Sequence, residues 1–239
     1  MANNGKTRIV GNGLIAKSFA HVNFKKDTLV LASGVSNSKE IRESEYLREV
    51  ELIKREISYH SNVNVIYFST CSLINGAESR YTRHKLDMEC LVSKTAPSFH
   101  IFRLPQVVGW VKNSTLVSFL TNSIIYKRNL SIQSYAKRNL VDVTDVARIT
   151  SEIVNQELGI NSIQNIASSI SVSVVDVVGE ISSILEREAI YACTESGDDQ
   201  SVDNNFLKNS LDHDDIIFSN DYWRLVLRKY VPLYLNYYG

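Results

Sequence analysis

Short apolar runs alternate with longer amphipathic segments along most of the chain, and this alternation is the feature that most constrains the fold. The strand candidates are residues 7–10, 29–32, 63–69, 98–104 and 162–167, and the helix candidates are residues 13–22, 38–60, 80–94 and 144–156. Residues 29–32 (LVLA) have no polar side, which suits a strand covered by helices on both faces. The pattern predicts a mostly parallel α/β sheet with helices on both faces.

Helix and strand boundaries are less regular in the second half of the chain. Residues 114–128 and 173–187 are helix candidates, residues 129–136 form a short strand candidate, and Ser38 is the expected N-cap of the long helix upstream. Residues 194–221 are rich in Asp, Asn and Ser, which predicts a loop with little core. The tyrosine-rich tail from residue 222 is expected to be a helix docked by its aromatic face, in preference to a membrane or partner anchor.

Composition excludes several classes of protein. The 239 residues are 44% apolar and 22% charged with a formal net charge of zero, so no overall field favours nucleic acid or an anionic membrane. No apolar run approaches the roughly 20 residues that span a bilayer, and the polar N-terminus does not resemble a signal peptide. The three cysteines lack paired spacing, which favours free thiols over disulfides or a metal site. We therefore expect a cytoplasmic protein.

A glycine-rich turn follows the first strand candidate directly. Gly11, Gly13 and Ala16 fit the Gly-x-Gly-x-x-Gly/Ala pattern, in which the backbone approaches a pyrophosphate at the start of a helix. A simple glycine turn before a helix explains the same residues, so the motif alone leaves both interpretations open.

Residues 67–85, YFSTCSLINGAESRYTRHK, combine a strand end with a candidate catalytic pair. Tyr81 and Lys85 are four residues apart, so both project from one face of a helix. A neighbouring ammonium lowers the pKa of a phenol, which would suit Tyr81 to general acid–base chemistry. The alternative is a half-buried tyrosine beside a solvated lysine.

The order of motifs resembles the extended short-chain dehydrogenase/reductases, in particular the nucleotide-sugar epimerases and reductases. The glycine turn, Ser-Thr at a strand end and Tyr-x-x-x-Lys are followed by RLPQVVG (103–109), RNLVDVTDVA (138–147) and NIA (165–167). The resemblance covers roughly residues 5–190. It implies a Rossmann core formed by residues 1–112 with 137–168, and a substrate cap formed by 113–136 with 169–239. It also implies a homodimer that pairs residues 39–59 and the Tyr81 helix with their copies.

The same resemblance implies a set of site residues. The catalytic residues would be Tyr81, Lys85 and Thr70, with Cys71 as the other candidate for the strand-end position. NAD(P)H, as NADH or NADPH, would contact Gly11, Asn12, Gly13, Leu14, Ile15, Ala32, Ser33 and Lys85. A nucleotide-diphosphate sugar would contact Thr70, Cys71, Ser72 and Arg138. A salt bridge from Arg138 to Asp142 or Asp145 is the structural alternative for that arginine.

The resemblance also points to a reaction and to a departure from the family. Cys71 and Ser72 stand where family dehydratases carry Asp-Glu, which leaves reduction of a 4-keto sugar as the first expectation and 4-epimerisation as the alternative. Only HVNFKKDT separates the first helix from the second strand, where the family has two further strands on the side of the sheet that binds adenine. The family residue that contacts the adenosine ribose ends one of these strands, so it has no counterpart here. Lys25 and Lys26 could meet a phosphate or form a solvated pair. A non-catalytic binding or regulatory protein is the alternative from another class.

Overall fold

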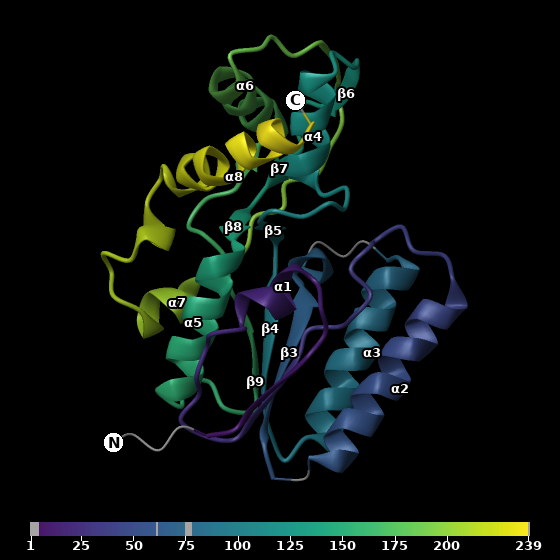
Figure 1. The fold of residues 1–239 in the computed structure, drawn as a ribbon, viewed down its shortest axis with the longest axis vertical. Coiled ribbons are helices and arrows are strands. Elements are labelled where there is room, and N and C mark those ends of the chain that lie inside the picture. Colours follow the sequence, from purple (N-terminus) through teal and green to yellow (C-terminus); the bar gives the residue numbers. More distant parts are fainter. Residues whose placement is uncertain (1–4, 61, 75–77, 239) are drawn as a thin grey trace. The chain divides into compact units, whose positions relative to one another are not determined.

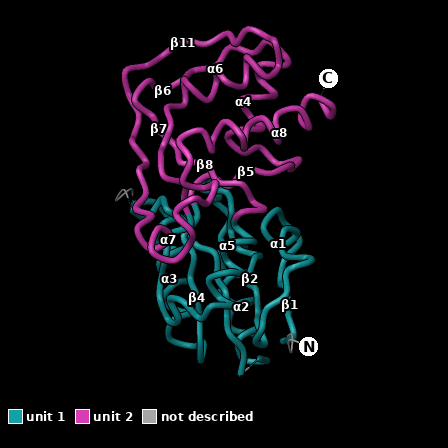
Figure 2. The backbone as a smooth tube through the Cα atoms, turned by 90° about the vertical axis from the view of Figure 1, so that its left-hand side faces the viewer, with its two compact units in different colours: residues 1–104, 146–166 teal, residues 105–145, 167–239 magenta. Residues whose placement is uncertain are grey.

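The computed structural model describes residues 5–60, 62–74 and 78–238. The chain forms two compact units (Figure 2). Unit 1 comprises residues 1–104 and 146–166, and unit 2 comprises residues 105–145 and 167–239. These units divide the chain near residues 104 and 145, whereas the predicted core and cap divide it at 112 and 137. The assignment of a substrate-binding cap stays a prediction.

Unit 1 is built on a five-stranded sheet whose strands are all parallel. The strands lie in the order β1 (Thr7–Val10), β2 (Thr28–Leu31), β3 (Asn64–Thr70), β4 (Ser98–Leu104) and β9 (Ser162–Asn165). All seven residues of the central strand β3 are buried. The predicted parallel α/β sheet is confirmed, and the continuous apolar runs are explained by cover on both faces.

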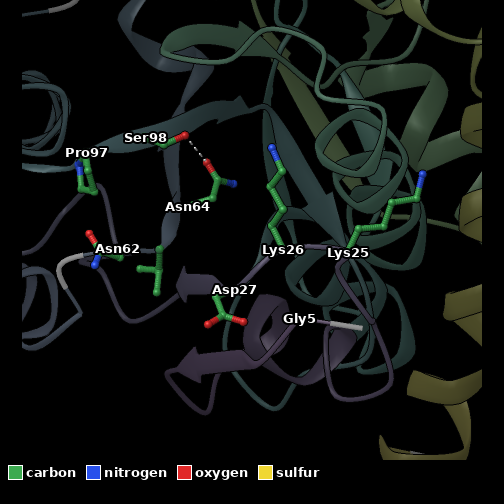
Figure 3. Close-up of a pocket in the computed structure, with 9 residues that line it drawn as sticks. Gly5, Lys25, Lys26, Asp27, Asn62, Asn64, Pro97 and Ser98 are labelled. Atoms are coloured by element: carbon green, nitrogen blue, oxygen red, sulfur yellow. Dashed lines mark hydrogen bonds between the residues drawn. The ribbon is translucent and has the colours of Figure 1, made fainter. Parts of the chain in front are cut away.

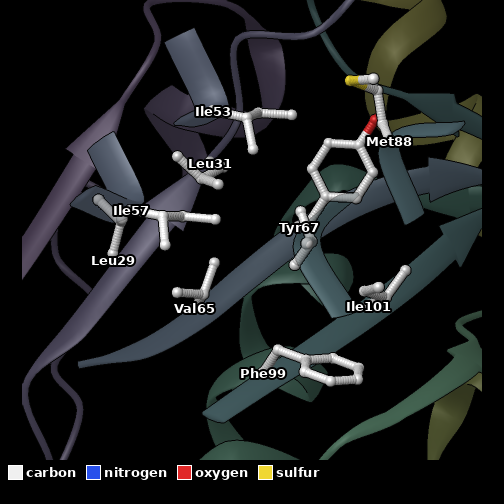
Figure 4. Packing of buried hydrophobic residues seen from close by; sticks show 10 residues of the cluster. Leu29, Leu31, Ile53, Ile57, Val65, Tyr67, Met88, Phe99 and Ile101 are labelled. Carbon is white, nitrogen blue, oxygen red and sulfur yellow. The ribbon is translucent and has the colours of Figure 1, made fainter. Parts of the chain in front are cut away.

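Helices cover both faces of this sheet (Figure 1). The helices α2 (Glu43–Tyr59) and α3 (Arg80–Thr95) pack one face, where Ile53 and Met88 join strand residues such as Tyr67 in one apolar cluster (Figure 4). The short α1 (Leu14–Ser18) and α5 (Val143–Asn155) lie on the other side. There the ring of Phe19, just after α1, lies 5.5 Å from the ring of Phe68.

The strand order shows the expected truncation. Among the described residues, β1 pairs only with β2, so β1 is the edge strand on the side where the resemblance implies two further strands. From β1 to β4, each strand lies beside the one before it and the direction across the sheet does not change. The helix α1, however, covers the face of the sheet opposite to the one that α2 and α3 cover. The β1–α1–β2 connection therefore has the opposite hand to the two that follow. About 98% of such connections are right-handed, so two connections of opposite hand in one sheet are rare.

The start of α2 differs from the sequence prediction. The helix begins at Glu43 with Arg42 as its N-cap residue, so the expected N-cap at Ser38 is wrong. Glu40 holds the preceding turn, because its Oε1 accepts from the backbone N–H groups of Ile41 and Arg42 at 3.0 Å each. This side chain competes with helix formation for those backbone donors.

Unit 2 consists of short strand pairs and a helical layer. Its strands are β5 (Gln106–Val108) with β8 (Leu140–Asp142), β6 (Leu130–Gln133) with β11 (Tyr191–Thr194), and β7 (Lys137–Arg138) with β10 (Val172–Ser173). The tail helix α8 (Tyr222–Tyr238) packs against α4 (Leu116–Ile125) and α6 (Val174–Leu185). It buries Tyr222, Trp223, Tyr230 and Tyr234, as the aromatic tail predicted.

The segment 194–221 contributes more core than the sequence suggested. It contains α7 (Asn205–Ser210) and the 3-10 helix η2 (Ile216–Phe218). Leu207 and Ile217 are fully buried, one in each element. Isolated apolar residues among many polar ones gave no periodic signal, which is why the prediction of a loop with little core was wrong.

Candidate active site

Thr70 ends the central strand β3 and organises the turn that follows it. Its Oγ1 accepts from the Ser72 backbone N–H at 3.2 Å and donates to the Ser72 hydroxyl at 3.1 Å. Thr70 is thereby the N-cap of the 3-10 helix η1 (Cys71–Leu73). A small hydroxyl residue at this strand end is explained locally by the turn, and its position at the carboxyl edge of a parallel sheet is where ligands of this fold class bind.

Tyr81 and Lys85 both face inward from α3. The helix starts with a reciprocal capping box between Ser79 and Thr82, which fixes the helical register of the residues that follow. Tyr81 is 8% exposed and Lys85 is 4% exposed. The alternative of a solvated surface lysine is therefore wrong. The catalytic roles of both residues stay predictions.

The electrostatic setting of Tyr81 differs from the one expected. Burial raises the pKa of Tyr81 to about 12; a side-chain hydrogen bond with Thr70 opposes this rise, and the charge of Glu49 adds to it. The sequence predicted a lowering by the ammonium of Lys85. That ammonium instead donates to Glu49 Oε1 and to the Tyr67 hydroxyl, at 3.0 Å each.

Glu49 is the residue that sequence reasoning missed. This carboxylate of α2 is 1% exposed and accepts from Tyr67, Lys85, His84 and the backbone of Val35. Burial acts to raise its pKa, but the hydrogen bond from His84 and the charge of Lys85 outweigh burial and lower the pKa to about 2. The available signal was an acidic residue in register with Tyr46 and Ile53 on the apolar face of the helix.

The glycine turn leaves room beside the backbone at one position and none at another. Gly11 has φ +133°, and a Cβ there would lie 2.3 Å from the carbonyl oxygen of Ala32. Gly13 is the N-cap of α1, and a Cβ there would meet nothing within 4 Å. The other predicted cofactor contacts all lie in unit 1. Asn12, Leu14 and Ile15 lie within or just after the glycine turn, and Ser33 lies just after β2. The turn thus has the strand–glycine–helix context that the motif requires, although α1 is only five residues long.

Cys71 follows Thr70 and is buried. Burial raises the pKa of its thiol to about 12, with Arg103 opposing this shift and Glu89 adding to it. Arg103 is itself held by Glu89, through contacts of 2.8 and 2.6 Å. A thiol that stays protonated is a poor base, so this geometry argues against Cys71 as a base. For the strand-end hydrogen bond Thr70 stays the preferred candidate, because a thiol is the weaker donor.

Arg138 lies in unit 2 and has a partner that was not expected. It pairs with Asp198 at 2.9 Å and donates to the carbonyl oxygens of Lys137 and Asp198. Asp142 is bonded instead by Lys229 and Tyr230. Arg138 thus forms a structural salt bridge, as the alternative expected, but with Asp198. Contact of Arg138 with a diphosphate stays a prediction.

A cavity of about 570 Å³ lies at the opposite, amino-terminal end of the strands (Figure 3). Its lining includes Lys25, Lys26, Asp27, Asn64 and Ser98, and none of the predicted site residues. Lys26 is paired with Glu157 at 2.8 Å, both side chains being more than half exposed. Ligands in open parallel sheets bind outside the carboxyl ends of the strands, so this cavity does not define the active site.

The described residues hold neither a candidate metal site nor a candidate membrane span. Across the described ranges, no group of three or more His, Cys, Asp or Glu side chains could hold a metal ion. No helix in the same ranges is long and apolar enough to cross a membrane.

Comparison with known proteins supports the resemblance at the level of the fold. No family model matches the chain, and no curated protein matches it in sequence. Among solved structures, UDP-glucose 4-epimerase with UDP-glucose from Thermotoga maritima is 16% identical with a TM-score of 0.70, over 90% of this chain and 79% of that one. A dTDP-4-dehydrorhamnose reductase from Clostridium acetobutylicum is 15% identical with a TM-score of 0.70, over 92% and 84%. RMD from Pseudomonas aeruginosa, complexed with NADPH, is 12% identical with a TM-score of 0.71, over 89% and 82%.

These likenesses define the class of fold. The chain has the Rossmann-type α/β architecture that these solved structures share, in a form shortened to 239 residues. At identities of 12–16% they assign the fold, and the activity is argued from the site.

Proposed function

We propose that this protein is an NAD(P)H-dependent ketoreductase that reduces the 4-keto group of a nucleotide-linked sugar. The observation that supports the proposal is that Thr70 ends β3, while Tyr81 and Lys85 are buried side chains of α3, a helix that packs against β3. Thr70 also opposes the effect of burial on the pKa of Tyr81, which supports the assignment of both hydroxyl groups to one carbonyl oxygen. The similar fold of a dTDP-4-dehydrorhamnose reductase supports the choice of substrate class, and that of RMD, complexed with NADPH, supports the choice of cofactor.

The protein residues would divide the work of reduction between them. Tyr81 would donate its proton to the carbonyl oxygen, and Thr70 would hold that oxygen by a second hydrogen bond. The nicotinamide, when bound, supplies the hydride to the carbonyl carbon. At neutral pH Tyr81 is a neutral phenol, since its pKa is about 12, and this is the form that begins a reduction. Epimerisation would begin from the phenolate form, which is scarce at that pH.

The residues of this chain fit the pyrophosphate and nicotinamide of the dinucleotide better than its adenosine. At Gly11 a side chain would strike Ala32, and at Gly13 the backbone is open, so the turn can admit a pyrophosphate. Among the described residues, no strand lies beyond β1 to carry an acidic or basic reader of the adenosine ribose. Binding would therefore rest on the turn and on the nicotinamide side.

Two measurements test this function. Titration of purified protein with NADH and NADPH, followed by nicotinamide fluorescence, tests cofactor binding, and consumption of NAD(P)H with a 4-keto nucleotide sugar tests turnover. Tyr81→Phe should lower turnover by roughly 10² to 10⁴ while cofactor binding is retained, because only the proton donor is lost. Tyr59→Phe is the matched control, since Tyr59 is 76% exposed on α2. Full activity of Tyr81→Phe would refute the catalytic role.

Two observations favour a second candidate, a non-catalytic protein that binds a nucleotide or sugar nucleotide. The ammonium of Lys85 is already paired with Glu49, and β1 is an edge strand. Binding of a sugar nucleotide with no nicotinamide fluorescence change for either cofactor would select this candidate over the ketoreductase.

A further inference from the structure

The cavity at the amino-terminal end of the strands of unit 1 has no part in the proposed reduction. It encloses about 570 Å³, and small-molecule sites usually enclose about 300–1,000 Å³. A second, smaller cavity lies beside it, and the two share four lining residues: Lys25, Lys26, Asn64 and Ser98. These four residues therefore lie where the two cavities meet.

The sheet itself brings these residues together. Asn64 begins β3 and Ser98 begins β4, and the two are paired in the register of these parallel strands. The Ser98 hydroxyl donates to Asn64 Oδ1 at 3.0 Å (Figure 3). On its other side Asn64 is paired with Thr28, the first residue of β2, and the two lysines directly precede that strand. An amide, a hydroxyl and two ammonium groups thus border one space.

The amide of Asn64 has a polar atom without a partner. Asn64 is 8% exposed, and none of the residues that the structure describes bonds its buried Nδ2. In Figure 3 this nitrogen points away from Ser98, toward the side where Lys26 lies. Buried polar groups in folded proteins are almost always paired, so an unpaired amide atom beside a cavity indicates a ligand group there.

The neighbouring His100 does not supply the missing partner. Its Nε2 lies 3.0 Å from the carbonyl oxygen of Leu158, which only accepts, so Nε2 carries a proton. Burial lowers the pKa of His100, so the ring is neutral at pH 7 and its Nδ1, 3.2 Å from Asn64 Oδ1, has no proton to donate. Turning the amide over would pair Nδ2 with Nδ1 of His100 but leave Oδ1 unpaired instead. A hydroxyl group both donates and accepts, so it satisfies the amide in either orientation.

The segment before β2 supplies positive charge. No acidic side chain of the described residues forms an ion pair with Lys25, and Lys26 pairs with Glu157 through side chains that are 64% and 53% exposed. Such an exposed pair contributes little and is readily exchanged for another anion. Asp27 also lines the larger cavity, where its Oδ1 accepts from the Lys6 backbone N–H at 2.7 Å. Two ammonium groups against one carboxylate leave this lining positive, which favours an anion.

The backbone that carries the two lysines is held in place. The Lys25 backbone N–H donates to Asn155 Oδ1 at 2.8 Å, and the Asn64 backbone N–H donates to the carbonyl oxygen of Asp27 at 2.9 Å. Phe24, the residue before the lysines, is fully buried. Binding therefore has to order the lysine side chains but not the segment, which favours affinity.

We propose that this cavity is a second binding site of unit 1, for a small anion that carries hydroxyl groups, the chemistry that sugar phosphates and sugar acids share. The anionic group lies at Lys25 and Lys26, and a hydroxyl group lies at the amide of Asn64. The glycine turn follows the carboxyl end of β1, so a phosphate held by these lysines is not one of the dinucleotide. The proposal is independent of the ketoreductase function, because none of these residues belongs to the proposed active site.

The first test is a titration of the purified protein, without cofactor, with four probes, followed by the amide NMR signals of residues 25–27, 62–64 and 98. Glucose 6-phosphate and gluconate carry both an anionic group and hydroxyl groups, whereas glucose carries only hydroxyl groups and sulfate only charge. At least one of the first two probes should bind at least about tenfold more tightly than glucose and sulfate, because it alone meets the lysines and the amide together. Tighter binding of glucose 6-phosphate would assign a phosphate to the site, and tighter binding of gluconate a carboxylate. Binding of both at or below the level of glucose and sulfate would overturn the proposal.

The second test uses variants and the probe that binds more tightly. Lys25→Met should weaken it by at least about tenfold through loss of a charged partner, whereas Lys54→Met, at an exposed lysine of α2 outside the cavity, should not. Asn64→Leu, which removes the amide at similar volume, should also weaken binding. If Asn64→Leu does not fold, Asn64→Asp keeps the shape and an acceptor for Ser98, and its carboxylate should repel the anion. Unchanged binding in Lys25→Met, or in whichever variant of Asn64 folds, would overturn the proposal. Both tests run without cofactor or turnover, so failure of the ketoreductase does not affect them.

Discussion

The buried pair of Glu49 and Lys85 should be strongly coupled in the stability of unit 1. The two side chains are 1% and 4% exposed, so Lys85→Met leaves an uncompensated buried carboxylate. Removing one partner of such a pair costs about 3–5 kcal/mol. Three donors still face Glu49 after the change, which favours the lower end of that range. Glu49→Met/Lys85→Met should recover part of the loss, with a coupling energy on the order of 2 kcal/mol.

The assay has to report on unit 1. Both tryptophans, Trp110 and Trp223, belong to unit 2, so their fluorescence follows the other unit. Hydrogen exchange of the α2 and α3 amides gives the free energy of opening of the relevant helices. Glu51→Gln and Lys54→Met are the matched exposed controls, expected within about 0.5 kcal/mol of the wild type. Effects of the two buried substitutions that add within about 0.5 kcal/mol would refute the coupling.

The same pair has a defined pH dependence. The pKa of Glu49 is lowered from 4.5 to about 2, which corresponds to about 3 kcal/mol of stabilisation. Because the folded-state pKa is the lower one, this contribution is present above pH 4.5 and is lost as the pH falls toward 2. In Lys85→Met the pKa of Glu49 should rise, so the loss should begin at higher pH.

Four further outcomes are expected. Cys71 should resist alkylation at pH 8 while the exposed Cys90 reacts, because burial raises the pKa of the Cys71 thiol to about 12; equal rates would contradict this. Gly11→Ala should destabilise unit 1 by about 1–3 kcal/mol in chemical denaturation, since φ is +133° and the new Cβ meets a carbonyl oxygen; an unchanged midpoint would contradict the strain. NADH and NADPH should differ in affinity by less than about a hundredfold, or 2.7 kcal/mol, because no ribose reader follows β1 in the described residues. We also predict a symmetric dimer through α2 and α3, which sedimentation of a monomer at micromolar concentration would count against.

Local patterns predicted the sheet of unit 1 well and the electrostatics of the site poorly. The apolar runs and Pro105 gave the strands, because burial on both faces leaves a signal within each run. The ion pair of Lys85 could not be predicted in the same way. Tyr81 and Lys85 share a helix, so their spacing is visible, but the partner of Lys85 lies 36 residues away on α2. Pairings that cross elements depend on tertiary packing, and one sequence does not contain that information.

The sheet of unit 1 ends at β1 without exposing the core of the unit. β1 is only four residues long, and Arg8 on it pairs with Glu56 of α2 at 3.0 Å, both features that make an edge strand less prone to further pairing. The segment that replaces the missing strands buries Phe19 and Phe24 completely against the sheet. The shortened sheet is thus closed by its own side chains. Among the described residues no strand lies beyond β1, where a dinucleotide-binding sheet carries the contacts to the adenosine ribose. The decisive quantity is therefore the affinity that the glycine turn and the nicotinamide side provide without the adenosine half, and the fluorescence titration measures it directly.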